Sequence, residues 1–215
     1  MHTLDNAGRV WANTDDLTMK APPVYPEPRI LELKTFRDAR GFFIESYNKK
    51  TLEAEAITCE FVQDNHSRSV RNVVRGLHYQ IRQPQGKLVR VLYGEVLDVA
   101  VDIRRGSPSF GRHFSFLQNA EHPQAAWIPA GFAHGFAVRS EFAELFYKTT
   151  DYYAPEHERT IAWDDPDLRI DWGLTGPPVL SVKDRSGSAF RDAEVYEGDP
   201  SSTSEPAKAA ARRAS

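Results

Sequence analysis

The middle of the chain consists of short runs in which polar and apolar residues alternate, as at residues 30–33, 97–103 and 114–116. A period of two puts every second side chain on the same face, so each run predicts a strand with one buried face. Turn-forming residues separate the runs at short intervals: Arg40-Gly41, Gln85-Gly86, Tyr93-Gly94, Gly106-Ser107-Pro108 and Pro129-Ala130-Gly131. The pattern therefore predicts an all-β fold, an antiparallel sandwich or barrel with a few short helices such as residues 50–55. Two packed sheets that enclose a ligand cavity form a jelly-roll barrel, which is the architecture we expect.

The two ends of the 215-residue chain differ from its middle in composition. Residues 1–20 are mostly polar, and residues 198–215 read GDPSSTSEPAKAAARRAS, which offers almost nothing to bury. We therefore expect an N-terminal extension over residues 1–21, a single domain over residues 22–190 and a flexible C-terminal tail over residues 191–215.

Charge and cysteine content argue against several classes of protein. Lys and Arg total 27 against 30 Asp and Glu, and a net charge of −3 gives no field that attracts nucleic acid or an anionic membrane. The single cysteine, Cys59, cannot form an internal disulfide, and no apolar run approaches the ~18 residues that span a bilayer. Residues 1–20 also lack the basic-then-apolar order of a secretory signal, so we expect a cytoplasmic location.

Two histidine-containing segments, RGLHYQ (75–80) and PAGFAHGF (129–136), are punctuated by glycine or proline. Their spacing resembles the two motifs of the cupin superfamily, whose metal-binding members carry H-x-H, then a Glu seven residues before a glycine, and then P-x-G-x-x-H. Laid on this sequence, the pattern puts His78 at the first ligand position and Gln80 at the second. Lys87 takes the position of the Glu, seven residues before Gly94, and His134 takes the last position.

The lysine decides which kind of site this sequence predicts. A divalent cation needs neutral imidazoles and carboxylates, whereas Lys87 offers three donors, no acceptor and a positive charge. We therefore expect no metal and no cofactor, and a pocket that suits a developing negative charge such as an enolate oxygen. A metal-dependent cupin, a dioxygenase or isomerase in which His78 and His134 hold an ion, stays as an alternative hypothesis.

Seven separated blocks, which together extend over roughly residues 25–185, resemble the dTDP-4-dehydrorhamnose 3,5-epimerase family in order and spacing. The blocks are FRDARGFFIESY (36–47), FVQDNHSRS (61–69), RGLHYQ (75–80), QGKLVRVLYGEVLDVAVDIRRGSPSFG (85–111), WIPAGFAHGF (127–136), YKTTDYYAPEHE (147–158) and LSVKD (180–184). The resemblance implies a jelly-roll homodimer that acts without metal or nucleotide cofactor on dTDP-4-dehydro-6-deoxyglucose.

Inversion of a carbon beside a ketone requires removal of a proton from one face and its return to the other. His78 suits the base, because an imidazole is largely neutral at neutral pH yet can hold a proton. The resemblance assigns Asp184 as its carboxylate partner and Tyr147 as the proton donor on the opposite face. Lys87 and His134 are then expected beside the ketone oxygen. The nearby Tyr152 and Tyr153 compete with Tyr147 on residue type alone.

The resemblance also supplies positions that bind the nucleoside diphosphate. They are Arg40, Glu45, Gln63, Asn65, Arg75, Lys87, His134, Glu158 and Lys183. In the family the first arginine and glutamate reach the neighbouring subunit's site, so Arg40 and Glu45 imply a homodimer. A nucleotide-sugar-binding module without turnover is a further alternative, and the motifs leave open whether C3, C5 or both carbons are inverted.

Overall fold

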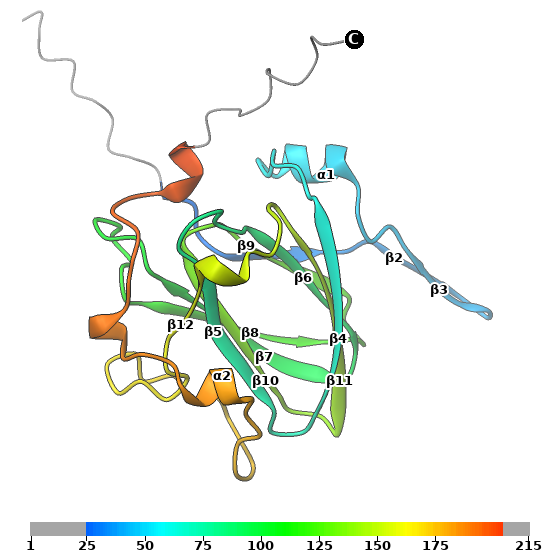
Figure 1. Cartoon of the computed structure of the whole chain (residues 1–215). Coiled ribbons are helices and arrows are strands. Elements are labelled where there is room, and N and C mark those ends of the chain that lie inside the picture. The colour runs from blue at the N-terminus through cyan, green and yellow to red at the C-terminus, as the bar shows by residue number, and fades with distance from the viewer. Residues whose placement is uncertain (1–24, 204–215) are drawn as a thin grey trace, which may run out of the picture.

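The computed structural model describes residues 25–203, which form two five-stranded antiparallel sheets packed face to face (Figure 1). The first sheet has the order β1 (Arg29–Glu32), β9 (Gln124–Ile128), β6 (Lys87–Tyr93), β11 (Phe142–Thr149) and β4 (Gln63–Val70). The second has the order β12 (Glu158–Thr160), β5 (Val74–Gln80), β10 (Phe132–Val138), β7 (Glu95–Asp102) and β8 (His113–Asn119). The all-β, antiparallel fold predicted from the sequence is confirmed.

Few helices accompany the sheets in the described part of the chain. They are α1 (Lys49–Ala54), α2 (Val182–Arg185) and three short 3-10 helices, η2 (Pro155–His157), η3 (Phe190–Asp192) and η4 (Pro200–Thr203). The short helix expected at residues 50–55 is α1, which Asn48 caps by accepting a hydrogen bond from the backbone N–H of Lys50. No helix among residues 25–203 is long and apolar enough to cross a membrane.

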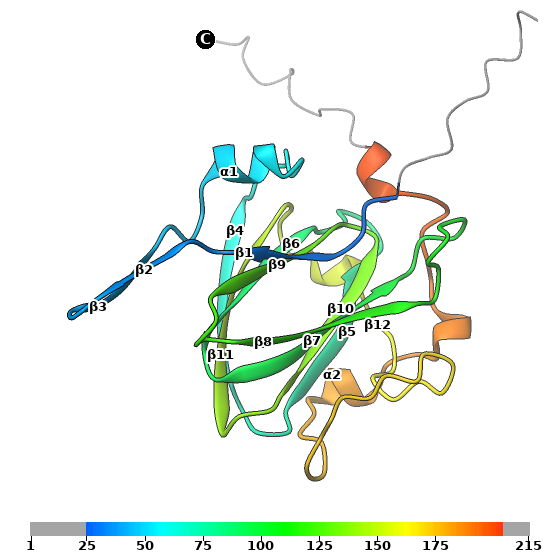
Figure 2. The ribbon, with the colours of Figure 1, turned by 180° about the vertical axis from the view of Figure 1, so that it is seen from behind.

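A third sheet, the hairpin of β2 (Thr35–Asp38) and β3 (Gly41–Ile44), projects from the body of the molecule (Figure 2). Its turn carries Gly41 with a φ of 127°, a conformation that favours glycine. Phe36, Phe42 and Phe43 on this hairpin are 51%, 64% and 67% exposed. Such a concentration of exposed aromatic rings on one projecting element is typical of an interaction surface.

The central strands of the second sheet are buried on both faces, which the simple alternation did not predict. Residues of β6, β7, β9, β10 and β11 fill the space between the sheets. On the outer face, side chains of β5, β7 and β10 pack against Ile161, Leu168 and Trp172 from the segment after β12. All seven residues of β10 are therefore buried, because a central strand covered on both sides has no solvent face.

Contacts with the core continue beyond residue 191, where we expected the C-terminal tail to begin. Ala193, Val195 and Tyr196 pack against the outer core cluster. The backbone N–H of Tyr196 donates to the carbonyl of Ile103, and its carbonyl accepts from Arg105. These apolar side chains are spaced among polar residues, which hid them from an analysis of composition. Residues 1–21 and 204–215, also assigned to the two ends, lie outside the described residues.

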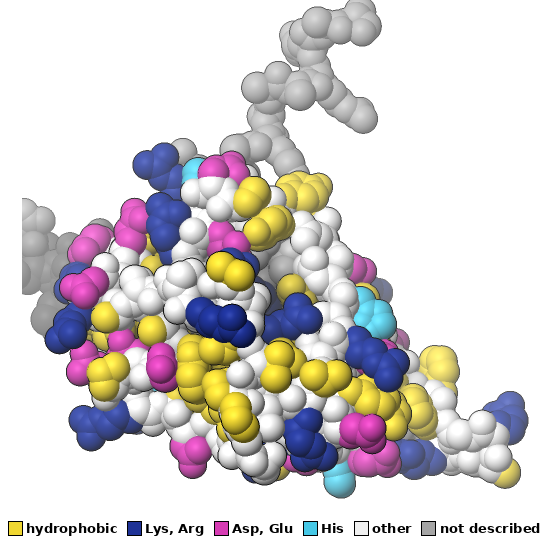
Figure 3. Space-filling model, turned by 60° about the horizontal axis from the view of Figure 1, so that its bottom comes forward, with side chains coloured by type: hydrophobic (Ala, Val, Ile, Leu, Met, Phe, Trp, Pro, Cys, Tyr) yellow, Lys and Arg dark blue, Asp and Glu magenta, His cyan; other side chains and the backbone are white. Residues whose placement is uncertain are grey.

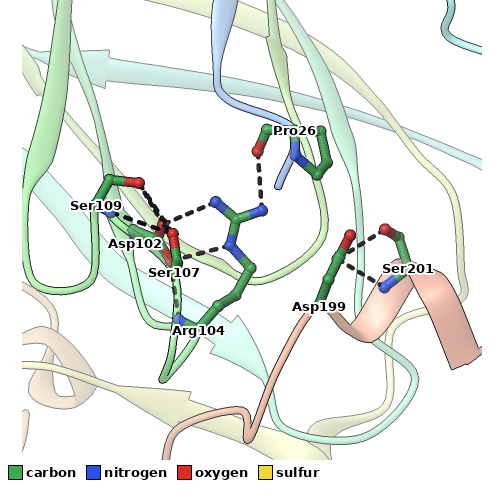
Figure 4. A network of polar contacts seen from close by, with 7 residues as sticks. All are labelled: Pro26, Asp102, Arg104, Ser107, Ser109, Asp199 and Ser201. Carbon is green, nitrogen blue, oxygen red and sulfur yellow. Dashed lines mark hydrogen bonds and ion pairs between the residues drawn. The ribbon is translucent and has the colours of Figure 1, made fainter. Parts of the chain in front are cut away.

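A buried ion pair fixes the turn that follows β7 (Figure 4). The guanidinium of Arg104 donates to both carboxylate oxygens of Asp102, and Ser107 and Ser109 donate to the same carboxylate. Burial alone would raise the pKa of Asp102, but these hydrogen bonds outweigh it and lower the pKa. Arg104 also donates to the carbonyl of Pro26, which ties the first described residues to this end of the sheet.

Candidate active site

A cavity of about 320 Å³ lies between the two sheets and is lined by strands of both. Nine of the predicted site residues line it: Gln63, Asn65, Arg75, His78, Lys87, His134, Tyr147, Glu158 and Lys183. On the face shown in Figure 3, Lys and Arg side chains are interspersed with acidic and hydrophobic ones. Positive side chains that could meet an anionic ligand also lie inside the cavity, where Lys87 and Lys183 line its wall.

His78 and Asp184 form a close pair although 106 positions separate them in the sequence. Nε2 of His78 lies 2.8 Å from Oδ1 of Asp184, although the approach is off the line of a well-directed hydrogen bond. Asp184 is held in α2 by a capping box with Ser181, and it also accepts the backbone N–H of Gly76 at 3.0 Å. With Nε2 facing the carboxylate, Nδ1 is the ring nitrogen left to take a proton.

The electrostatics of this pair suit a base. Burial is the main cause that lowers the pKa of His78, and the positive charges of Lys183 and Lys87 add to it, while Asp184 opposes them. Burial would raise the pKa of Asp184, but its contacts with His78, Ser181 and Gly76 lower it. At neutral pH the imidazole is therefore uncharged and faces a carboxylate that stabilises the imidazolium once a proton arrives.

The glycines of the two histidine segments allow the strands to approach closely beside the site. A Cβ on Gly76 would lie 2.4 Å from the Cα of Gly135, and one on Gly135 would lie 2.7 Å from the carbonyl oxygen of Arg75. Both distances are too short for any real side chain, so only glycine fits at these two positions. His78 on β5 and His134 on β10 consequently stand opposite each other in the ladder.

Lys87, the first residue of β6, places an ammonium group in the cavity. Burial lowers its pKa to about 8, and the carboxylates of Asp98 and Glu158 partly offset that effect. Near neutral pH the side chain is mostly charged but poorly solvated, a state in which it interacts strongly with an anion. The lysine thus lies where the sequence analysis expected an oxyanion to form.

Asp98 is a site residue that the sequence analysis missed. Its Oδ1 lies 2.6 Å from Nε2 of His134, and its Oδ2 accepts a hydrogen bond from Nε2 of Gln118 at 3.0 Å. Asp98 and His134 are both buried. A signal was present, because the alternation puts Asp98 on the same strand face as the apolar Val96 and Ala100, which point between the sheets.

Tyr147 and His78 come from opposite walls of the cavity. His78 belongs to β5 in the second sheet, whereas Tyr147 belongs to β11 in the first, next to the strand that carries Lys87. Burial raises the pKa of Tyr147, so its phenol is neutral and able to donate a proton. The exposed Tyr152 does not line the cavity, while Tyr153 does.

Polar side chains surround the rim of the cavity. Glu158 accepts hydrogen bonds from the hydroxyl of Tyr153 at 2.8 Å and from Nζ of Lys183 at 2.7 Å. Nε2 of Gln63 donates to Oδ1 of Asn65 at 2.9 Å, and Arg75 is exposed. These groups could hold the phosphates and the base of a nucleotide.

Arg40 and Glu45 are not brought to this cavity. Arg40 lies at the tip of the projecting hairpin, where its guanidinium pairs with Asp38 and its side chain is 89% exposed. Glu45, just after β3, accepts a hydrogen bond from Asn48. Within one chain they have no access to the substrate, so their predicted role requires a second subunit.

The cavity does not fit a divalent cation. Nowhere in residues 25–203 do three or more His, Cys, Asp or Glu side chains come together as a metal-binding group. Gln80, at the second ligand position, uses its amide oxygen to accept the backbone N–H of Ala154. An ammonium group, from Lys87, stands where a metal-binding cupin has its carboxylate, and it would repel the ion.

Comparison with known proteins shows which family the chain belongs to. The model of the dTDP-4-dehydrorhamnose 3,5-epimerase family matches residues 25–192. The chain belongs to this family. A dTDP-4-dehydrorhamnose 3,5-epimerase of Pseudomonas aeruginosa is 60% identical over 172 residues, which cover 80% of this chain and 95% of that protein.

Solved structures of epimerases share the fold. The 3,5-epimerase of Legionella pneumophila, in complex with dTDP-4-keto-L-rhamnose, is 51% identical with a TM-score of 0.76, covering 78% of this chain and 89% of that one. A 3'-monoepimerase of Streptomyces bikiniensis, in complex with dTDP-quinovose, is 31% identical with a TM-score of 0.73, covering 79% and 87%. The family is an isomerase family, and the names of these two structural neighbours differ in the carbons inverted.

The electrostatics of this epimerase-family site predict the titration of Lys87. We expect its ammonium to titrate at about pH 8 instead of the ordinary 10.5, and replacement of Asp98 by Asn to lower the pKa further, because the carboxylate stabilises the charged form. NMR of ¹³C-lysine-labelled protein would follow the ε-carbon, assigned with a Lys87→Arg variant. Asp64→Asn, which removes an exposed carboxylate paired with Lys148, is the control. An unshifted Lys87 would contradict the burial of its charge.

Proposed function

We propose that this protein is an epimerase of dTDP-4-dehydro-6-deoxyglucose in dTDP-rhamnose or related deoxysugar biosynthesis, inverting C3, C5 or both, beside the ketone, through an enolate. The observation that carries the proposal is the placement of a base, His78, and an acid, Tyr147, on opposite walls of a cavity also lined by Lys87. Inversion needs proton removal on one face of the sugar and proton delivery on the other, which this arrangement supplies.

The reaction follows from these three side chains. His78 takes the proton from the carbon beside the C4 ketone, and the electron pair of that C–H bond moves to the ketone oxygen as the enolate forms. The ammonium of Lys87 stabilises the oxyanion, assisted by His134. The phenol of Tyr147 then donates its proton to the opposite face of the carbon and the ketone re-forms. Proton exchange with solvent returns Tyr147 to the phenol and His78 to the neutral imidazole.

The rim supports recognition of the nucleotide. The reacting sugar occupies the part of the cavity with His78, Lys87 and Tyr147, so the diphosphate and the base extend toward Arg75 and Lys183. Arg side chains suit forked contacts with phosphate, and Lys adds a further positive charge. The Legionella relative, with its dTDP-4-keto-L-rhamnose, supports the same class of ligand here.

Solvent deuterium exchange tests the proposed reaction. Incubation with dTDP-4-dehydro-6-deoxyglucose in deuterated water should label C3, C5 or both, and NMR of the product reads how many carbons are inverted. Tyr147→Phe should lower turnover by about 10²–10⁴-fold, because a neutral acid is lost while the cavity keeps its shape. Binding of the sugar nucleotide with no label at either carbon would show a binding module instead, and chelator-sensitive turnover would show a metal-dependent cupin.

We further propose that the enzyme acts as a homodimer in which Arg40 and Glu45 of one subunit complete the cavity of the other. Three features of the chain support a partner subunit. The hairpin that carries Arg40 projects from the body and exposes three phenylalanines. Glu45 lies at its base, outside the cavity of its own chain. Nε of Arg90, on the first sheet, is buried without a hydrogen-bond partner among the described residues.

Subunit complementation tests this shared site. Arg40→Ala and His78→Ala should each be nearly inactive alone, because one lacks the residue donated to the neighbour and the other lacks its own base. After co-refolding, mixed dimers contain one cavity with both groups intact, so activity should recover to about a quarter of the wild-type value by random pairing. No recovery in a mixture proven to contain heterodimers would show that Arg40 serves its own chain.

A further inference from the structure

The segment from Asp151 to Ala154, between β11 and η2, is held almost entirely by side chains. It has no regular secondary structure and makes no ladder hydrogen bonds with a neighbouring strand. Backbone polar groups that are partly removed from water need partners. Here those partners are the amide groups of three glutamines that come from three different parts of the barrel.

Gln80, the last residue of β5, makes the most of these contacts. Its Nε2 donates to the carbonyls of Gln83 at 2.8 Å and of Tyr152 at 3.2 Å, and its Oε1 accepts the N–H of Ala154 at 2.8 Å. The residue is only 3% exposed. Both the nitrogen and the oxygen of the amide are engaged. Only asparagine carries the same amide group, and its side chain is one methylene shorter.

Gln63 and Gln85 hold the same segment from two other directions. Oε1 of Gln63, on β4, accepts the N–H of Tyr153 at 3.0 Å. Nε2 of Gln85, in the loop between β5 and β6, donates to the carbonyl of Asp151 at 2.9 Å, a carbonyl that also accepts the hydroxyl of Thr149. The segment is thus tied at four successive residues, with Gln80 making two of the ties.

The tied segment carries a part of the cavity rim. Tyr153 lines the cavity with half of its surface exposed, and its hydroxyl donates to Glu158, which is paired in turn with Lys183. None of the three groups of the proposed reaction, His78, Lys87 and Tyr147, belongs to this segment. The ties therefore hold none of the reacting groups directly, although the Glu158–Lys183 pair that Tyr153 contacts also acts electrostatically on His78 and Lys87.

We propose that Gln80 is a positioning residue for nucleotide binding. It fixes the segment at Tyr152 and Ala154, and so holds Tyr153 and the Glu158–Lys183 pair in the geometry that binds the dTDP part of the substrate. This inference rests on the proposed epimerase function. According to the motif spacing, Gln80 stands at a position that binds metal in other cupins. Here its side chain instead holds the segment at the cavity rim, and we call this contact the clamp.

Replacement of Gln80 by Leu tests the clamp. The variant keeps the volume but loses the two ties, so the Kd for dTDP, measured by calorimetry, should rise about tenfold, as expected for the loss of one or two net hydrogen bonds. At saturating substrate, kcat for solvent deuterium exchange should stay within about threefold of wild type, since the reacting groups are untouched. Gln85→Leu should have a smaller effect on Kd, because Thr149 still holds the carbonyl of Asp151.

The controls separate positioning from folding. Gln83→Ala removes an exposed glutamine side chain three residues away and should change neither constant. Gln80→Leu combined with Tyr153→Ala should weaken dTDP binding no more than Tyr153→Ala alone, because the clamp acts through that residue.

An unchanged Kd, a loss confined to kcat, or fully additive effects in the double variant would overturn the proposal. Because dTDP binding is measured without turnover, a wild-type protein that binds dTDP but exchanges no deuterium would refute the reaction and leave the clamp to be judged on Kd.

Discussion

The site depends on one constraint, the placement of a positive charge inside the barrel. Removing an ammonium from water is costly, and the lowered pKa of Lys87 records that cost. Two carboxylates offset it: Asp98, which is also held by His134 and Gln118, and Glu158 at the rim. The charge is balanced well enough to persist near neutral pH, yet it remains available to an oxyanion that forms in the cavity.

The two-sheet architecture places side chains on opposite walls of the cavity around this charge. Strands of one sheet carry Lys87 and Tyr147, and a strand of the other carries His78. Because each sheet is fixed by its ladder and by a shared core, the proposed acid and the proposed base are held on opposite walls without any need for movement. The rim is built differently, from an irregular segment tied by glutamines, and we propose that it binds the nucleotide part of the substrate.

Much of the fold could be predicted because alternation and turn residues are local signals. The strands around Gly94 and Gly131 follow directly from them. The burial of β10 on both faces could not be predicted in this way, since it depends on a segment more than twenty residues later in the chain. The contacts of Tyr196 with Ile103, beyond the expected boundary at residue 191, are also long-range, and no local pattern reveals them.

The site residues also differ in whether local signals or long-range contacts reveal them. Motif spacing and charge were sufficient to single out His78, Lys87 and His134, which the structure brings into one cavity. Asp184 came only from the family resemblance, because its approach to His78 is a long-range contact. Asp98 had a local signal, because its carboxylate lies on the inward face of a strand. The spacing of the histidine motifs does not include this position. The proposed roles of Arg40 and Glu45 involve a second subunit, which one chain cannot display.

Replacement of Lys87 by Met keeps the length of the side chain and removes its charge, and it tests the role of the buried ammonium most directly. The measurement is the rate of solvent deuterium exchange beside the ketone at saturating substrate, with dTDP affinity measured in parallel. We expect exchange to fall by about 10²–10³-fold, the loss typical of removing one oxyanion-stabilising group, while dTDP still binds. Exchange at the wild-type rate would show that the buried ammonium does not stabilise the enolate.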